Sequence, residues 1–144
     1  INTLEVCSDL DWFLIRYPMK MSIEDSNRLK IRKHLFEQRN INFEKILAPD
    51  YIPRKVNLKP PFELRNYQAS AVELLFKNKS LLLGDDLGLG KTVTGIGHLL
   101  GEGTLPAFIV VPTHLAHHWR DKIKEMTNLK THLIQGTQPY DLPS

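Results

Sequence analysis

Residues 80–94 read Ser-Leu-Leu-Leu-Gly-Asp-Asp-Leu-Gly-Leu-Gly-Lys-Thr-Val-Thr. A short apolar run of leucines leads into a loop with three glycines, and Lys91 and Thr92 then begin a segment with helical spacing. A buried strand, a glycine-rich turn and a helix N-terminus in this order are typical of a phosphate-binding loop, because the first N–H groups of a helix attract anions. This stretch therefore predicts an α/β fold with an anion site at the start of a helix.

Each part of the loop has its own expected role. Glycine lets the backbone N–H groups curl around phosphate oxygens, in a shape that a Cβ would obstruct. The ammonium of Lys91 is expected to reach the outer phosphates, and the hydroxyl of Thr92 to complete a Mg²⁺ shell. We predict both as catalytic residues. The predicted nucleotide contacts in the loop are Asp85, Asp86, Gly88, Leu89, Gly90, Lys91 and Thr92.

The loop departs from the strict pattern G-x-x-x-x-G-K-[ST], which has glycine where this chain has Asp85. Two other interpretations exist. The pair Asp85 and Asp86 after an apolar run resembles an independent Mg²⁺ site, and an ordinary strand-to-helix turn can carry a surface lysine. Gly-Leu-Gly-Lys-Thr follows the two acids directly, which places them inside the loop and favours phosphate binding.

Length and composition are ordinary for one globular domain, with 144 residues, 42% hydrophobic and 24% charged. No apolar run approaches the ~20 residues of a membrane span, so we expect no membrane partner. The single cysteine, Cys7, excludes an intrachain disulfide and fits a reducing, intracellular compartment. A formal charge of +3 permits a nucleic-acid partner without requiring one.

Residues 1–60 are predicted to form a small α+β extension. Apolar and aromatic runs at 3–6 and 12–17 favour two strands of a β-hairpin. We interpret the aromatic side chains of the second strand as core, with a base-stacking surface as the alternative; they are Trp12, Phe13 and Tyr17. Four prolines in 49–61 predict an extended connector, either flexible or lying along a surface.

Between the hairpin and the connector, residues 21–39 predict an amphipathic helix with a capping box at Ser22 and Asp25. Residues 40–48 predict one more short helix. The first helix is strongly basic; a solvated face is the favoured interpretation, and a nucleic-acid contact is the alternative. A protein partner for residues 1–60 is a further hypothesis.

Residues 61–144 alternate between helical and apolar segments. Helices are expected from Asn66, after the glycine-rich loop, and from Thr113. Gly95 and Gly97 weaken the second of these helices, which indicates close packing against a neighbouring strand. The expected strands are 81–83, 107–111 and 132–134. Such an alternation predicts a parallel sheet with right-handed crossovers.

Three histidines near the start of the last helix suggest a metal site, because His114 and His118 are one helical turn apart and His117 lies between them. A zinc site needs further ligands, and no H-E-x-x-H pattern is present. Polar residues at a helix start are the favoured interpretation.

Three motifs in order resemble those of Swi/Snf-type ATPases, which are superfamily-two helicase-like enzymes. The first is Leu-Arg-Asn-Tyr-Gln at 64–68, and the second is the glycine-rich loop at 84–92. The third is Ile-Val-Val-Pro-Thr-His-Leu at 109–115, followed by Trp119. In that family an acidic residue regularly replaces the missing glycine, which accounts for Asp85.

The resemblance implies a truncated RecA-like lobe of a motor that hydrolyses ATP with Mg²⁺ and moves along double-stranded DNA. By position, Gln68 would read the adenine edge, and Arg65 or Tyr67 would pack beside the base. Thr113 and His114 would contact the DNA backbone. Residues 1–60 would be an extension, and 61–144 the first part of the ATP-binding domain.

Two departures from the family pattern affect these expectations. Asp86 and Leu87 stand where the family more often has Glu and Met. The Asp-Glu-x-His motif and the second lobe are absent from these 144 residues, so we expect the chain alone not to turn over ATP. The alternative is a small nucleotide-binding or interaction module without motor activity.

Overall fold

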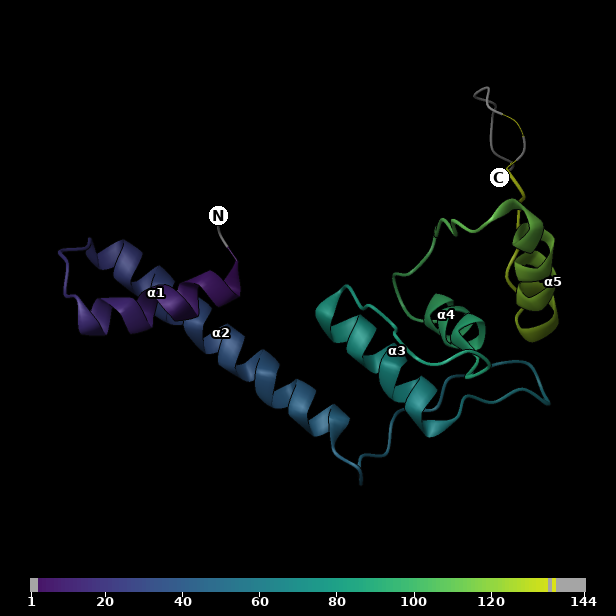
Figure 1. Cartoon of the computed structure of the whole chain (residues 1–144), viewed down its shortest axis with the longest axis horizontal. Helices are drawn as coiled ribbons and strands as arrows, with labels where there is room; N and C mark the ends of the chain where they lie inside the picture. Colours follow the sequence, from purple (N-terminus) through teal and green to yellow (C-terminus); the bar gives the residue numbers. More distant parts are fainter. Residues whose placement is uncertain (1–2, 135, 137–144) are drawn as a thin grey trace. The chain divides into compact units, whose positions relative to one another are not determined.

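The structure, a computed structural model, describes residues 3–134 and 136. All regular elements in this part of the chain are helical (Figure 1). They are α1 (Leu4–Arg16), α2 (Ile23–Leu47), α3 (Asn66–Asn78), α4 (Lys91–Leu99), the 3₁₀ turn η1 (Thr113–Leu115) and α5 (Ala116–Met126). The chain forms two compact units, one up to Tyr51 and one from Ile52 onward.

The described residues contain no β-strand, so the predicted parallel α/β sheet of a RecA-like lobe is wrong for this structure. The three segments predicted as strands have no regular structure: 81–83, 107–111 and 132–134. A strand is stable only when its N–H and C=O groups pair with a neighbour. Here the apolar side chains of these segments are largely uncovered, since Leu82 and Val110 are each 96% exposed.

The N-terminal segment is the helix α1 and not the predicted β-hairpin. The Oγ1 of Thr3 accepts a hydrogen bond from the N–H of Val6 at 3.2 Å, which caps the helix. Leu4, Cys7 and Leu14 recur at helical spacing, with Cys7 buried and the two leucines half-buried. Helix α1 lies against α2 (Figure 1). The helical period of the buried side chains therefore outweighs the aromatic and branched residues that suggested strands.

The aromatic side chains of α1 are exposed, which corrects their interpretation as core. Trp12 is 69% exposed, Phe13 40% and Tyr17 56%. The rings of Phe13 and Tyr17 contact each other with centroids 4.9 Å apart. The face of α1 that contacts α2 carries Cys7, so the aromatic residues point elsewhere.

Helix α2 begins where the capping pattern predicts. The Oγ of Ser22 accepts from the N–H of Asp25 at 3.0 Å and donates to its carboxylate at 2.7 Å. The two predicted helices are one, because no Gly or Pro interrupts the segment around Asn40. Lys33 Nζ donates to the Asp11 carboxylate at 2.7 Å and ties α2 to α1.

The second unit has its core between the connector and two helices. Buried apolar side chains come from all three parts: Leu58, Ile96, Leu99, Ile123 and Met126. The backbone N–H of Lys59 donates to the carbonyl of Met126 at 2.8 Å, and its ammonium donates to the carbonyl of Lys124 at 3.1 Å. The proline-rich connector therefore lies along the surface of this unit.

Both glycines in α4 permit close packing, as predicted, but their neighbours are not strands. A Cβ on Gly95 would lie 3.1 Å from the ring of Trp119 on α5. A Cβ on Gly97 would lie 2.8 Å from Cδ1 of Leu64, just before α3. Absent side chains thus let α4 approach the rest of the core.

Within the described residues, no helix is both long and apolar enough to cross a membrane.

Candidate functional site

The glycine-rich loop runs from Gly84 to Gly90 and ends at the N-terminus of α4. Gly88 has φ +86° and Gly90 has φ +79°, which are left-handed conformations that favour glycine. Gly90 caps α4, and its carbonyl accepts from the N–H groups of Val93 at 2.8 Å and Thr94 at 3.1 Å. The N–H groups of Lys91 and Thr92 precede these bonds and have no acceptor inside the helix, so they are directed at the loop.

The ammonium of Lys91 points into the loop. Its Nζ donates to the carbonyl of Asp85 at 2.7 Å and to the carbonyl of Asp86 at 2.9 Å. An ammonium has three donors and a full positive charge, and two neutral carbonyls satisfy it less well than anionic oxygens. The positive charge of Lys91 therefore lies in the loop beside the positive end of a helix dipole.

Tyr67 and Gln68, at the start of α3, both donate hydrogen bonds to the same oxygen atom of the loop. The Tyr67 hydroxyl donates to the carbonyl oxygen of Leu89 at 2.8 Å, and Gln68 Nε2 donates to the same oxygen at 3.0 Å. The Oε1 of Gln68 accepts from the N–H of Arg65 at 2.9 Å. Both ends of the Gln68 amide are thus engaged, and the residue is 5% exposed.

Gly90 fits closely against Gln68. A Cβ at Gly90 would lie 2.6 Å from Gln68 Nε2, and the positive φ would strain any L side chain. The contact between α3 and the loop therefore requires glycine at this position, and it explains the second glycine of Gly-Leu-Gly without reference to a ligand.

The residues present fit a phosphate group. The loop supplies one ammonium, a helix N-terminus and backbone that glycine leaves open, since a Cβ at Gly88 would meet nothing within 4 Å. Thr92 lies in the first turn of α4, half-buried, where its hydroxyl is available to a magnesium ion held by phosphate. Among the described residues, no three His, Cys, Asp or Glu side chains gather as a metal site of their own.

The other predicted site residues either join this contact network through their backbone, as Arg65 and Asp86 do, or lie outside it. Arg65 precedes α3 with an exposed side chain, and Asp86 is exposed in the loop. Thr113 and His114 are exposed in η1, where Thr113 makes no capping hydrogen bond through its side chain. The structure thus brings Tyr67, Gln68 and the loop together, whereas no hydrogen bond or ion pair that we find joins η1 to them.

His98 lies on the far side of α4, where it faces α3. Its ring contacts that of Phe76 with centroids 4.6 Å apart, and its Nδ1 is buried without a hydrogen-bond partner. Burial lowers the pKa of His98 below its usual value, and the charge of Lys79 lowers it further. A neutral imidazole therefore belongs to the interface between these helices.

The sequence gives no signal for one part of this site. The acceptor for Tyr67 and Gln68 is the backbone carbonyl of Leu89, and a carbonyl is the same group at every residue. In the sequence, the contact between Gln68 and the loop is reflected in the second glycine of Gly-Leu-Gly, because a Cβ at Gly90 would lie too close to Gln68.

Comparisons with known proteins found a family model and a human relative that match this chain. The family model described as SNF2-related domain matches residues 9–141. Human TATA-binding protein-associated factor 172 is 33% identical over 126 residues, which cover 74% of this chain. The match covers 6% of that relative, so the chain spans a small part of its length. No solved structure matches.

Proposed function

Because this chain belongs to the family of the SNF2-related domain, we propose that its glycine-rich loop binds the phosphates of ATP for a Swi/Snf-type motor. The observation that supports the proposal most directly is the position of Lys91. Its ammonium lies inside the loop, 2.7 Å and 2.9 Å from two backbone carbonyls. A surface lysine has no reason to lose side-chain freedom for two neutral acceptors beside the N-terminus of a helix.

Phosphate oxygens are better acceptors for this ammonium than carbonyls. A phosphate oxygen carries negative charge, so its contact with the ammonium adds a Coulomb attraction that a neutral carbonyl does not provide. A bound triphosphate therefore replaces the carbonyls of Asp85 and Asp86 as the partners of Lys91, and the backbone N–H groups at Gly88 and Gly90 face the same anion. Binding exchanges weak contacts within the loop for strong ones with the ligand.

The remaining predicted contacts keep the roles that their positions suggest. Thr92 completes the shell of a Mg²⁺ ion that the phosphates carry, and this ion neutralises charge that develops on the transferred group. Asp85, Asp86 and Leu89 contribute loop backbone. Arg65, Tyr67 and Gln68 lie at the adenine side. Beyond its bonds to Leu89 and Arg65, the Gln68 amide has one further N–H and one further lone pair for the base.

In the complete protein, we propose that ATP hydrolysis drives movement along double-stranded DNA, and that Thr113 and His114 contact the DNA backbone. Residues 61–144 form the first part of the ATP-binding domain in this proposal, and 1–60 an extension. These 144 residues contain no Asp-Glu-x-His motif. The chain alone is therefore expected to bind ATP without turnover, because catalysis of phosphoryl transfer needs a group that positions the attacking water.

Titration with a fluorescent ATP analogue in the presence of Mg²⁺ tests this function. The Lys91→Met variant removes the ammonium and keeps the length of the side chain, and it should bind the analogue at least about tenfold more weakly, the loss of one charge-assisted contact. Lys77→Met is the matched control, because Lys77 is exposed at the end of α3 away from the loop. Equal affinity of Lys91→Met and Lys77→Met would contradict the proposal.

A further inference from the structure

Helix α1 carries apolar side chains on two neighbouring sides. One face contains the buried Cys7 and packs against α2. The other face carries Val6, Leu10 and Phe13 at positions i, i+4 and i+7, and these are 38–40% exposed. A helix that is apolar on two sides is stable in water only when both sides are covered, so the outer face of α1 has the character of an interface.

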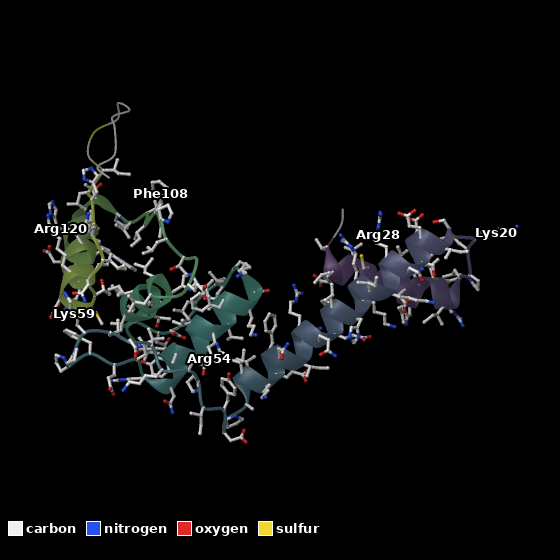
Figure 2. All side chains as sticks on the ribbon, turned by 180° about the vertical axis from the view of Figure 1, so that it is seen from behind. Lys20, Arg28, Arg54, Lys59, Phe108 and Arg120 are labelled. Atoms are coloured by element: carbon white, nitrogen blue, oxygen red, sulfur yellow. The ribbon has the colours of Figure 1, made fainter. Side chains whose placement is uncertain are left out.

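An open groove lies on this outer face, with a volume of about 480 Å³. We call it the α1 groove, and its lining residues are Val6, Asp9, Leu10, Trp12 and Phe13. Four of the five are apolar, and Trp12 is 69% exposed. Figure 2 draws the side chains of this unit, with Arg28 and Lys20 labelled. Large aromatic residues of this kind dominate the energy of protein interfaces.

Two exposed carboxylates of α1 lie at or near the α1 groove: Asp9 belongs to its lining, and Glu5 precedes Asp9 on the same side of the helix. Glu5 and Asp9 are one helical turn apart, both are exposed, and neither has an ion-pair partner among the residues that the structure describes. The third acid of α1 differs: Asp11 is bound to Lys33 of α2 at 2.7 Å. The free negative charge of the helix therefore lies at or near the groove.

We propose that the α1 groove binds an amphipathic helix of a partner protein, whose apolar stripe is bordered by Lys or Arg. The apolar residues of such a helix would cover Val6, Leu10 and Phe13, and its cations would pair with Glu5 and Asp9. An apolar groove that receives one face of a helix is a common mode of peptide recognition, and complementary charge at the rim fixes the orientation.

Charge argues against a nucleic acid as the occupant. Residues 1–51 contain eight Lys or Arg and eight Asp or Glu, so this unit has no net charge, and the charged residue in the groove lining is Asp9. A phosphate backbone would be repelled by Glu5 and Asp9. The basic side chains of α2 are partly engaged with acids of the same helix, as in the contact of Arg28 with Glu24 at 3.4 Å.

Two designed helical peptides test the proposal with the whole 144-residue chain. Both have Leu at positions i, i+3, i+4 and i+7; one has Lys beside this stripe, and its twin has Glu at the same places. Fluorescence anisotropy of the labelled peptides measures affinity. The chain also contains Trp119, so a change in tryptophan emission that is lost in the Trp12→Phe variant reports whether the groove is covered. We expect the Lys peptide to bind at least about tenfold more tightly than its twin.

Reversal of the groove charge completes the test. The combined variant Glu5→Lys and Asp9→Lys should prefer the Glu peptide, whereas Glu44→Lys, an exposed acid of α2, should leave the preference unchanged. Circular dichroism checks that each variant keeps its helices. Equal binding of both peptides, binding of neither, self-association of the chain that competes with the peptide, or protection of Trp12 by duplex DNA would each overturn the proposal.

Discussion

The hydroxyl of Tyr67 donates a hydrogen bond to the carbonyl oxygen of Leu89 over 2.8 Å. These residues are far apart in the sequence, and the bond joins the first turn of α3 to the loop that precedes α4. Gln68 donates to the same oxygen at 3.0 Å, so two side chains hold one carbonyl. That carbonyl belongs to the residue before Gly90, and its position sets the direction in which the loop enters α4.

Removal of the Tyr67 hydroxyl should therefore weaken nucleotide binding through the loop. We expect Tyr67→Phe to lower the affinity for the fluorescent ATP analogue about fivefold, which corresponds to the ~1 kcal/mol of one net hydrogen bond. Tyr17→Phe is the matched control, because Tyr17 is exposed in the other unit. Unchanged affinity of Tyr67→Phe would mean that Gln68 alone positions the loop.

The helices of the second unit could be predicted because their signals are local. Asn66 to Asn78 and the segment after Gly90 carry apolar residues at helical spacing, and the structure has helices at both places. The capping pattern at Ser22 was equally reliable, since a hydroxyl reaches an N–H three residues away.

The strands could not be judged from local signals. The apolar run 107–111 has the composition of a buried strand, but composition does not state whether a neighbouring strand is present to accept its hydrogen bonds. In the structure this segment is extended and exposed, with Phe108 at 74% (labelled in Figure 2). At α1 the same residue types lie on a helix, because the spacing of Cys7 and Leu14 matches contact with α2.

Gly97 lets α4 approach Leu64 closely, so the effect of Gly97→Ala on stability should change sign when Leu64 is shortened. A Cβ at Gly97 would lie 2.8 Å from Leu64 Cδ1, so Gly97→Ala should lower the free energy of unfolding by about 1 kcal/mol, as expected for overpacking. In a Leu64→Ala background the clash is absent. Gly97→Ala should then raise the free energy of unfolding by up to ~1 kcal/mol, because Ala has the higher helix propensity. Urea denaturation of the four chains measures the coupling; strict additivity would refute the contact.

Thr94 and Thr127 are both buried threonines, and we expect their replacement by valine to change stability in different directions. Both are at most 5% exposed, but Thr94 Oγ1 has no hydrogen-bond partner, whereas Thr127 Oγ1 donates to the carbonyl of Ile123 at 2.7 Å and accepts from the N–H of Leu129 at 3.1 Å. Thr94→Val should therefore leave stability unchanged or raise it by about 1 kcal/mol, because it removes an unsatisfied polar group. Thr127→Val should lower it by about 1–3 kcal/mol, since an N–H group loses its acceptor. Thermal unfolding of both variants measures the difference, and equal shifts would contradict it.

The neutral imidazole of His98 predicts a specific dependence of stability on pH. Burial against α3 lowers the pKa of His98, and the charge of Lys79 contributes in the same direction. The unfolded chain has an ordinary histidine pKa near 6.5, so as pH falls below that value it binds a proton before the folded chain does. Below about pH 6.5 the unfolded state therefore gains protons, and stability decreases down to the lowered pKa of the folded state; above pH 6.5 the contribution of His98 is constant.

His98→Phe isolates this effect, because Phe keeps an aromatic ring against Phe76 and cannot titrate. The loss of melting temperature between pH 7.5 and pH 5 should be smaller for His98→Phe than for the unsubstituted chain, and Phe should also remove the penalty of the unpartnered Nδ1. His117→Gln serves as the control for the loss of one histidine, since His117 is exposed on α5. If the melting temperatures of the unsubstituted chain and His98→Phe fall in parallel, the imidazole is not held neutral between α3 and α4.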